Sequence, residues 1–262
     1  KIRFTEPNRE ILARRDSIIN DLTRLVDPAG LITSTDECRA YETDALTAYR
    51  KMPLAVVLPK TTEEVSAVLK YCHDTGVKVV PRGAGTSLAG GAIPSEDAVV
   101  LGLSKMNRVL AVNYDDRFIR VEAGVTNLSV TAVVAENGFF YAPDPSSQLA
   151  CTIGGNIANN SGGAHCLKYG VTTNNLLGVR MVLIDGSIID LGGDYLDSAG
   201  LDLLGLVVGS EGQLGIVTEA TLRILKSAEG ARPVLFGFPS CEGAGKAVAD
   251  VIAAGIIPVA IE

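Results

Sequence analysis

The sequence predicts an α+β fold with two subdomains, a small β-α-β part and a larger antiparallel sheet with helices. Three observations lead to this prediction. Strand and helix patterns alternate between residues 55 and 80, as in parallel β-α-β units. Two hairpin patterns follow, at residues 109–121 and 179–191, which indicate antiparallel pairing. Glycine contributes 28 of 262 residues and is concentrated in three segments, which indicates loops that form a functional site.

The N-terminal region is predicted to be helical. Residues 9–26 have the apolar spacing of an amphipathic helix, and residues 27–30 contain the Pro and Gly that end it. A polar stretch with little periodicity follows to about residue 51. We therefore expect an N-terminal helical extension over residues 1–40.

The β-α-β part follows directly. An apolar strand is predicted at residues 55–58 and a second at residues 77–80, parallel to the first and joined by a right-handed crossover. Thr61 and Glu64 have the spacing of a capping box at the start of the connecting helix. Gly76 is placed to end that helix in a left-handed conformation.

The antiparallel part is predicted from shorter patterns. Its strands are expected at residues 109–112, 118–121, 179–184, 187–191 and 218–225. Helices are expected at residues 128–136, between Thr126 and Gly138, and at residues 201–208. Asp185 and Gly186 form a strong hairpin signal.

A new pattern starts after about residue 232, with a strand at 234–238, a helix at 243–254 and a strand at 257–261. It predicts the truncated start of a further domain. The expected domains are the extension at 1–40, a two-subdomain unit at 41–230 with a break near residue 104, and this start at 231–262.

Composition argues against several classes of function. The net charge is −7 and no Lys/Arg cluster is present, which excludes a nucleic-acid surface. No apolar stretch is long enough to span a membrane, and residues 1–6 do not read as a signal peptide. Five cysteines without a Cys-x-x-Cys pair indicate reduced, buried or half-buried thiols in a cytoplasmic protein with no metal site, namely Cys38, Cys72, Cys151, Cys166 and Cys241.

The first glycine-rich segment, residues 79–91, directly follows a predicted strand, where α/β proteins place phosphate-binding turns. Glycine there lets backbone N–H groups close on a phosphate. The dinucleotide fingerprint fails because Leu88 takes its third glycine position, and the Walker loop fails because no Gly-Lys-Ser/Thr is present. Taken alone, the segment is also compatible with a turn that binds nothing.

Two further segments complete the pattern. Residues 143–147 lead to residues 152–163, where two Gly-Gly pairs and three Asn predict an irregular wall around a flat polar ligand. The third segment, residues 209–217, leads straight into a strand. Three such segments in fixed order on this frame predict one shared site.

These segments resemble the FAD-binding domain of the vanillyl-alcohol oxidase and p-cresol methylhydroxylase class of flavoproteins. Within that class the similarity is greatest to the group formed by the D subunits of glycolate oxidases and the related D-lactate and D-2-hydroxyglutarate dehydrogenases. It covers residues 41–226, and the tail from Arg232 is similar to the start of that group's cap domain. The resemblance implies FAD as cofactor and oxidation of a small 2-hydroxy acid by hydride transfer to the flavin.

The resemblance also implies roles for residues of each segment. The backbone of the first segment would hold the pyrophosphate, at Arg82, Gly83, Ala84, Gly85, Thr86, Ser87, Gly90 and Gly91. The ribityl chain and flavin ring would be lined by Pro143, Asp144, Thr152, Gly154, Gly155, Asn159 and Gly163. Gly212, Ile216 and Val217 would close the adenine side or the ring side. Members that bind FAD covalently through this loop have a His there; Thr86 and Ser87 stand here, so attachment should be non-covalent.

Catalytic residues are not assigned. His73 is interpreted as a helix-end residue, while His165 is interpreted as a local hydrogen-bonding residue with a flavin contact as the alternative, and Lys168 and Tyr169 as further candidates. The base and the substrate-binding Arg are expected beyond Glu262. The resemblance implies electron-transfer partner proteins, with an iron–sulfur protein as one candidate.

Other functions stay open at this point. The chain is also compatible with a flavin-binding module that has no activity of its own, or with a sugar or alcohol oxidase of the same flavin class. A nicotinamide-dependent dehydrogenase requires an acid about 20 residues past the glycine loop. Residues 104–108 offer no such acid.

Overall fold

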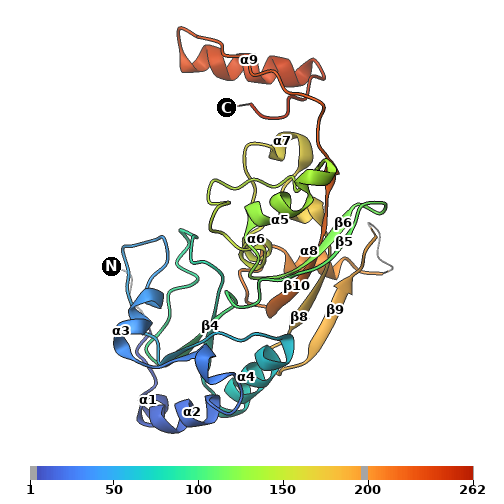
Figure 1. Ribbon diagram of the computed structural model, residues 1–262. Helices are drawn as coiled ribbons and strands as arrows, with labels where there is room; N and C mark the ends of the chain where they lie inside the picture. The colour runs from blue at the N-terminus through green and yellow to red at the C-terminus, as the bar shows by residue number, and fades with distance from the viewer. Residues whose placement is uncertain (1–4, 196–199, 262) are drawn as a thin grey trace.

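The structure, a computed structural model, describes residues 5–195 and 200–261. The first four residues of the predicted N-terminal extension and the last residue of the predicted tail lie outside this range. Figure 1 shows two sheets side by side with helices around them, and a C-terminal helix set apart from both.

The first sheet has four strands in the order β1-β2-β4-β3. They are β1 (Leu31–Ile32), β2 (Ala55–Val57), β4 (Ala98–Gly102) and β3 (Lys78–Arg82). The predicted parallel arrangement of β2 and β3 is confirmed, because both pair parallel with β4. The sequence analysis missed β4, which lies between them and is buried along its whole length.

Helix α4 (Thr62–Thr75) connects β2 to β3 and begins and ends where predicted. Thr61 Oγ1 accepts a hydrogen bond from the Glu64 N–H at 3.2 Å, and Gly76 closes the helix at φ +74°. The reciprocal half of the capping box differs from the prediction. The Glu64 carboxylate accepts from the N–H of Lys60, at 2.6 Å, instead of Thr61.

The N-terminal helices cover this sheet (Figure 1). They are α1 (Arg9–Ala13), α2 (Arg15–Leu22) and α3 (Thr35–Cys38), followed by a short 3-10 turn at Arg39–Tyr41. The single helix expected over residues 9–26 is interrupted at Arg14 and ends at Leu22. Ile11, Ile18 and Leu22 are its buried residues.

The second sheet has five antiparallel strands in the order β5-β6-β10-β8-β9. They are β5 (Val109–Asn113), β6 (Phe118–Glu122), β10 (Ile216–Arg223), β8 (Leu176–Val182) and β9 (Ile188–Gly192). Both predicted hairpins are confirmed. The strand latest in sequence, β10, lies in the centre: Ala220 is opposite Val121 on one side and Val179 on the other. A small separate pair joins β7 (Phe139–Phe140) to β11 (Leu225–Lys226).

Short helices accompany the second sheet: α5 (Asn127–Val134), α6 (Ile153–Asn159), α7 (Cys166–Tyr169) and α8 (Leu203–Val207). Helix α5 ends near Gly138 as predicted, but Thr126 Oγ1 bonds to Ser129 Oγ at 2.6 Å instead of capping the helix backbone. The irregular wall predicted around residues 152–163 is wrong for its first half, because α6 is a helix. Gly154 allows α6 to pack closely: a Cβ there would lie 2.9 Å from the Ala123 Cβ.

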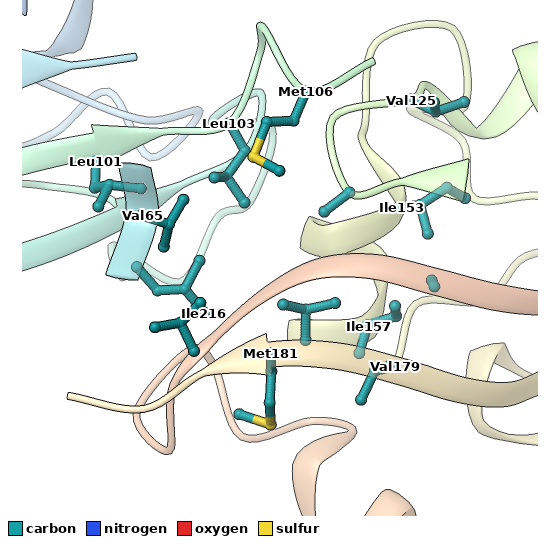
Figure 2. Close-up of a cluster of buried hydrophobic side chains, with 14 of the residues drawn as sticks. Val65, Leu101, Leu103, Met106, Val125, Ile153, Ile157, Val179, Met181 and Ile216 are labelled. Atoms are coloured by element: carbon teal, nitrogen blue, oxygen red, sulfur yellow. The ribbon is translucent and has the colours of Figure 1, made fainter. Parts of the chain in front are cut away.

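One continuous hydrophobic core joins the two sheets. Figure 2 shows side chains of both sheets meeting in it: Val65 of α4 and Leu101 of β4 on one side, and Ile157 of α6 with Met181 of β8 on the other. The predicted subdomain break near residue 104 falls between Leu103 and Met106, and both of these side chains are buried. The two sheets therefore hold each other through apolar burial.

The C-terminal tail departs from the prediction. Helix α9 (Cys241–Ala253) is confirmed, but residues 234–238 and 257–261 form no strand in the described part of the chain. Leu235 is 97% exposed, and among the described residues no strand pairs with this segment to satisfy an extended backbone. Apolar composition predicted strands there, but a strand also requires a partner.

The cysteines are all free thiols. Cys38, Cys72 and Cys151 are buried and Cys166 is half-buried, while Cys241 is exposed, so the prediction of burial is wrong for Cys241. Burial raises the pKa of the Cys72 thiol to about 12. Within residues 5–195 and 200–261, no cluster of His, Cys, Asp and Glu suits a metal ion and no helix is long and apolar enough to cross a membrane.

Candidate functional site

The three glycine-rich segments line a single cleft that is partly open to solvent. Most of the predicted site residues lie on its walls, namely Arg82, Gly83, Ala84, Gly85, Thr86, Ser87, Gly91, Thr152, Gly154, Gly155, Asn159, Gly212, Ile216 and Val217. Segments that are far apart in sequence are thus brought together.

The segments contact one another closely. A Cβ on Gly83 would lie 2.5 Å from Thr152 Oγ1, and one on Gly212 would lie 2.8 Å from the Pro81 ring. The third segment is hydrogen-bonded to the end of α6, because the Glu211 N–H donates to the Ala158 carbonyl at 2.8 Å. These contacts require glycine at the points of closest approach.

Helix α6 is fixed to the second sheet by backbone hydrogen bonds. The Ile153 N–H donates to Val125 O at 2.9 Å, and the Gly154 N–H donates to Ala123 O at 2.8 Å. Two buried amides extend the connection: Asn156 Nδ2 donates to Asn127 Oδ1, and Asn127 Nδ2 donates to Pro143 O. Pro143 is buried and does not line the cleft; the structure uses its carbonyl to hold α6 in place.

The first segment exposes a row of hydrogen-bond donors. The backbone N–H groups of residues 84–88 donate to no atom of residues 5–195 or 200–261. Gly85 at φ +70° and Gly90 at φ +81° adopt left-handed conformations, which glycine enters at low cost. A loop of unpaired N–H groups at the end of a strand is an anion-binding arrangement.

Charge is scarce on the cleft walls. Among the lining residues only Arg82 and Glu211 carry a formal charge. Arg82 Nη1 donates to the Thr43 carbonyl at 2.7 Å, so the guanidinium is turned toward the N-terminal region. Burial lowers the pKa of Arg82, and nearby Asp44 and Tyr41 oppose that effect. The remaining lining residues are uncharged, and many of them have small side chains.

The predicted residues Asp144 and Gly163 lie at a second hollow with Ser146, Gly162, Ala164, Leu167 and Ile261. Beside it, His165 Nδ1 and Asp144 Oδ2 are 2.6 Å apart, and the His165 N–H donates to Asp144 Oδ1 at 3.1 Å. His165 thus makes the local hydrogen bond that the sequence interpretation favoured. Gly90 does not line either hollow, and neither do Lys168 and Tyr169.

Sequence reasoning missed half of the cleft's residues. They are Pro81, Ala89, Ala92, Leu103, Ser147, Cys151, Asn156, Ile157, Ala158, Ser161, Val207, Ser210, Glu211 and Gly215. Most lie inside or next to the three segments, so the segments themselves were the usable signal. Leu103 and Val207 carry no signal of their own, because their patterns are those of ordinary core residues.

Comparisons with known proteins agree with this geometry. The family described as "FAD binding domain" matches residues 53–192. The chain is 49% identical over 248 residues to glycolate oxidase subunit GlcD of Escherichia coli strain K12, which covers 95% of this chain and 50% of that protein. It is 38% identical to a D-lactate dehydrogenase of Archaeoglobus fulgidus, with 94% and 55% covered.

The fold also has solved counterparts. An alkyldihydroxyacetonephosphate synthase matches with a TM-score of 0.80 at 22% identity, over 99% of this chain and 48% of that one. At this identity the match shows a shared fold. The chain spans about half the length of the curated relatives it matches.

Proposed function

This chain belongs to the FAD binding domain family, and from that premise we propose that its FAD is held without a covalent bond and accepts electrons from a small 2-hydroxy acid. The observation that carries the proposal is the convergence of three glycine-rich segments on one cleft, with a row of unpaired N–H groups on one wall. This donor set fits the pyrophosphate of FAD, because backbone N–H groups bind phosphate oxygens without a formal charge. Glycine on the facing wall leaves room for a flat ring.

Each segment has a part in this proposal. Residues 83–91 hold the pyrophosphate, the start of α6 with Thr152, Gly154, Gly155 and Asn159 lines the middle of the cofactor, and Gly212, Ile216 and Val217 close the remaining edge. When bound, FAD supplies an acceptor for the two electrons and the hydrogen that leave the substrate carbon. The chain's own residues orient the cofactor and exclude water from its buried side.

The substrate class rests on the relatives. Two of them are named for glycolate and D-lactate, which are both small 2-hydroxy acids. Oxidation of such an acid also requires a base for the hydroxyl proton and a cation for the carboxylate. We assign neither role to a residue of this chain. An electron-accepting partner is part of the proposal, since the Escherichia coli relative is named as a subunit.

The first test is the visible spectrum of the purified chain after incubation with FAD, followed by acid precipitation. A flavin spectrum that moves to the supernatant with acid supports non-covalent FAD. Flavin that stays with the precipitated protein is covalently bound and would contradict the proposal. The proposal expects no such bond, because the loop has Thr86 and Ser87 where covalent members have a His.

The second test is turnover of glycolate, D-lactate and D-2-hydroxyglutarate with an artificial dye as electron acceptor. Dye reduction that depends on the hydroxy acid supports the enzyme. Bound FAD without turnover of any of the three would favour the alternative of a flavin-binding module without activity of its own. Turnover of a sugar or simple alcohol instead would favour an oxidase of the same flavin class.

A further inference from the structure

Arg82 lines the cleft, and its guanidinium contacts residues of the N-terminal region. Its Nη1 donates to the Thr43 carbonyl at 2.7 Å. Its Cζ lies 5.5 Å from the centre of the Tyr41 ring, within the range of a cation–π contact. These contacts hold the guanidinium against Tyr41 and Thr43.

The Arg82 guanidinium also packs against the loop itself. A Cβ on Gly85 would lie 2.3 Å from Arg82 Nη2, so the guanidinium fills the space beside this left-handed residue. Arg82 therefore contacts the same loop whose N–H groups at residues 84–88 have no acceptor among the described residues.

Residues 41–46 (the backing segment) contact the loop directly as well. The Ala45 N–H donates to the Gly85 carbonyl at 2.9 Å. A Cβ on Gly90 would lie 3.5 Å from Leu46 Cδ2. The backing segment thus supports both left-handed turns of the loop, at Gly85 and at Gly90.

Asp44 supplies the charge behind this arrangement. Its side chain is 4% exposed, and its Oδ1 accepts the Leu46 N–H at 2.9 Å. Its Oδ2 is buried and has no hydrogen-bond partner among the described residues. A buried carboxylate oxygen without a partner is costly, and here its charge favours the protonated form of Arg82 against the effect of burial.

We propose that the backing segment and the Arg82 guanidinium hold residues 83–91 from behind, in the shape that presents their N–H groups to the FAD pyrophosphate. Arg82 is then a positioning residue and not a phosphate ligand. This inference rests on the proposed function, because it concerns how the loop recognises that cofactor.

The proposal makes a prediction that direct electrostatic binding does not. If Arg82 acted on the phosphates by charge alone, removal of the negative charge of Asp44 would strengthen the binding of an anion. If Asp44 and Arg82 act by shaping the loop, the same change weakens it. The Asp44→Asn variant keeps the side chain's size and its acceptor for Leu46, so it separates the two mechanisms.

The experiment titrates the purified chain with FAD and with riboflavin, which lacks the pyrophosphate. It compares wild type with Arg82→Ala, Arg82→Lys and Asp44→Asn, and with Arg24→Ala as a matched control. Arg24 is 71% exposed and pairs with Asp21 at 3.6 Å, outside the backing segment and the loop. Amide hydrogen exchange at Ala45, measured without flavin, reports the contact between the backing segment and the loop.

We expect Arg82→Ala to weaken FAD binding by at least tenfold and Asp44→Asn by about threefold or more. Arg82→Lys should keep part of the affinity. Riboflavin binding should stay within twofold in all variants, and Ala45 should exchange faster in Arg82→Ala and Asp44→Asn. Arg24→Ala should match wild type in every measurement.

Unchanged or tighter FAD binding by Asp44→Asn would overturn the inference, and so would an equal loss of FAD and riboflavin, which indicates a general fold defect. Either result would leave the proposed function intact as long as wild type binds FAD. Failure of wild type to bind FAD would instead overturn the proposed function, and this inference with it.

Discussion

At the scale of single residues, the cleft depends on glycines whose neighbours leave no room for a side chain. Gly83 is the clearest, since its φ lies outside the left-handed region and only contact restricts it. A Cβ there would lie 2.5 Å from Thr152 Oγ1, the atom that accepts the Gly155 N–H at the start of α6. The first segment and the start of α6 therefore pack so closely at this point that only glycine fits at residue 83.

We expect Gly83→Ala to reduce FAD affinity at least tenfold and stability by about 1–3 kcal/mol, because overpacking moves one wall of the cleft. Flavin titration and thermal unfolding measure the two effects. Gly245→Ala is the control: no atom lies within 4 Å of a Cβ there. The double variant Gly83→Ala with Thr152→Ala should recover part of the affinity, and no recovery would contradict the steric explanation.

From the sequence alone, site residues could be predicted as whole segments but not one by one. The segments around Gly85, Gly155 and Gly212 were found because glycine in such density is unusual for a helix or strand. The direction of the Arg82 side chain was not predictable, since its partners Tyr41 and Thr43 lie much earlier in the chain, in a stretch without periodicity. Tertiary contacts decide which atom of a residue faces the ligand.

At the scale of elements, a buried carboxylate joins the N-terminal helices to the first sheet. Asp97 precedes β4 and is 1% exposed. It accepts the Asn8 N–H at 2.9 Å, pairs with Lys78 Nζ at 2.8 Å and accepts from Ser95 Oγ at 2.7 Å. Burial alone would raise the pKa of Asp97, but these hydrogen bonds outweigh it and lower the pKa to about 2.

The lowered pKa of Asp97 makes the stability of the fold depend on pH. The unfolded chain has an Asp pKa of about 3.9, so Asp97 contributes stability above about pH 4 that is lost as pH falls toward 2. We expect Asp97→Asn to cost on the order of 2 kcal/mol at pH 7 and to flatten the pH dependence between 4 and 2. Urea unfolding across that range measures both. Asp36→Asn, an exposed site, should behave as wild type, and an equal acid dependence in Asp97→Asn would contradict this role.

Elements with a local signal were predictable, and elements defined by distant partners were not. Helix α4 has its cap, its period and its terminal glycine in one stretch, and it was predicted within a residue or two. Strand β4 was not predicted. Its apolar run at residues 98–102 follows a loop, and no helix precedes it to mark a further β-α-β unit. Residues 234–238 have a similar apolar run, but in the described part of the chain no strand pairs with them. The strand predicted there from composition was therefore wrong.

At the scale of the whole molecule, the tail is the part least integrated into the core. Residues 234–238 expose Val234, Leu235, Phe236 and Phe238, and α9 has no buried residue. Figure 1 shows α9 away from both sheets. A contiguous exposed apolar surface of this kind promotes association.

We expect the purified chain to self-associate as its concentration rises, and the double variant Leu235→Asp with Phe236→Asp to remain monomeric over the same range. Sedimentation velocity measures the species present. Leu201→Asp serves as the control, because Leu201 is 84% exposed but lies outside the tail. Association that persists in the double variant would place the contact elsewhere.

The fold class was predictable because two kinds of hydrophobic pattern occupy different halves of the chain. The parallel and antiparallel sheets are both present as expected. The shared core was not predictable, since side chains such as Val65 and Met181 come from distant parts of the sequence. Apolar burial has no direction, and only the assembled sheets determine which apolar faces meet.

The central place of β10 has a consequence for how the molecule is made. Four of the five strands in its sheet precede residue 193, while β10 begins at residue 216 and lies between β6 and β8. During synthesis the facing edges of β6 and β8 stay open until β10 has left the ribosome, and open edges invite aggregation. The third glycine-rich segment immediately precedes β10, so the cleft becomes complete in the same late step. We therefore expect a nascent chain stopped before residue 216 to lack one wall of the cleft.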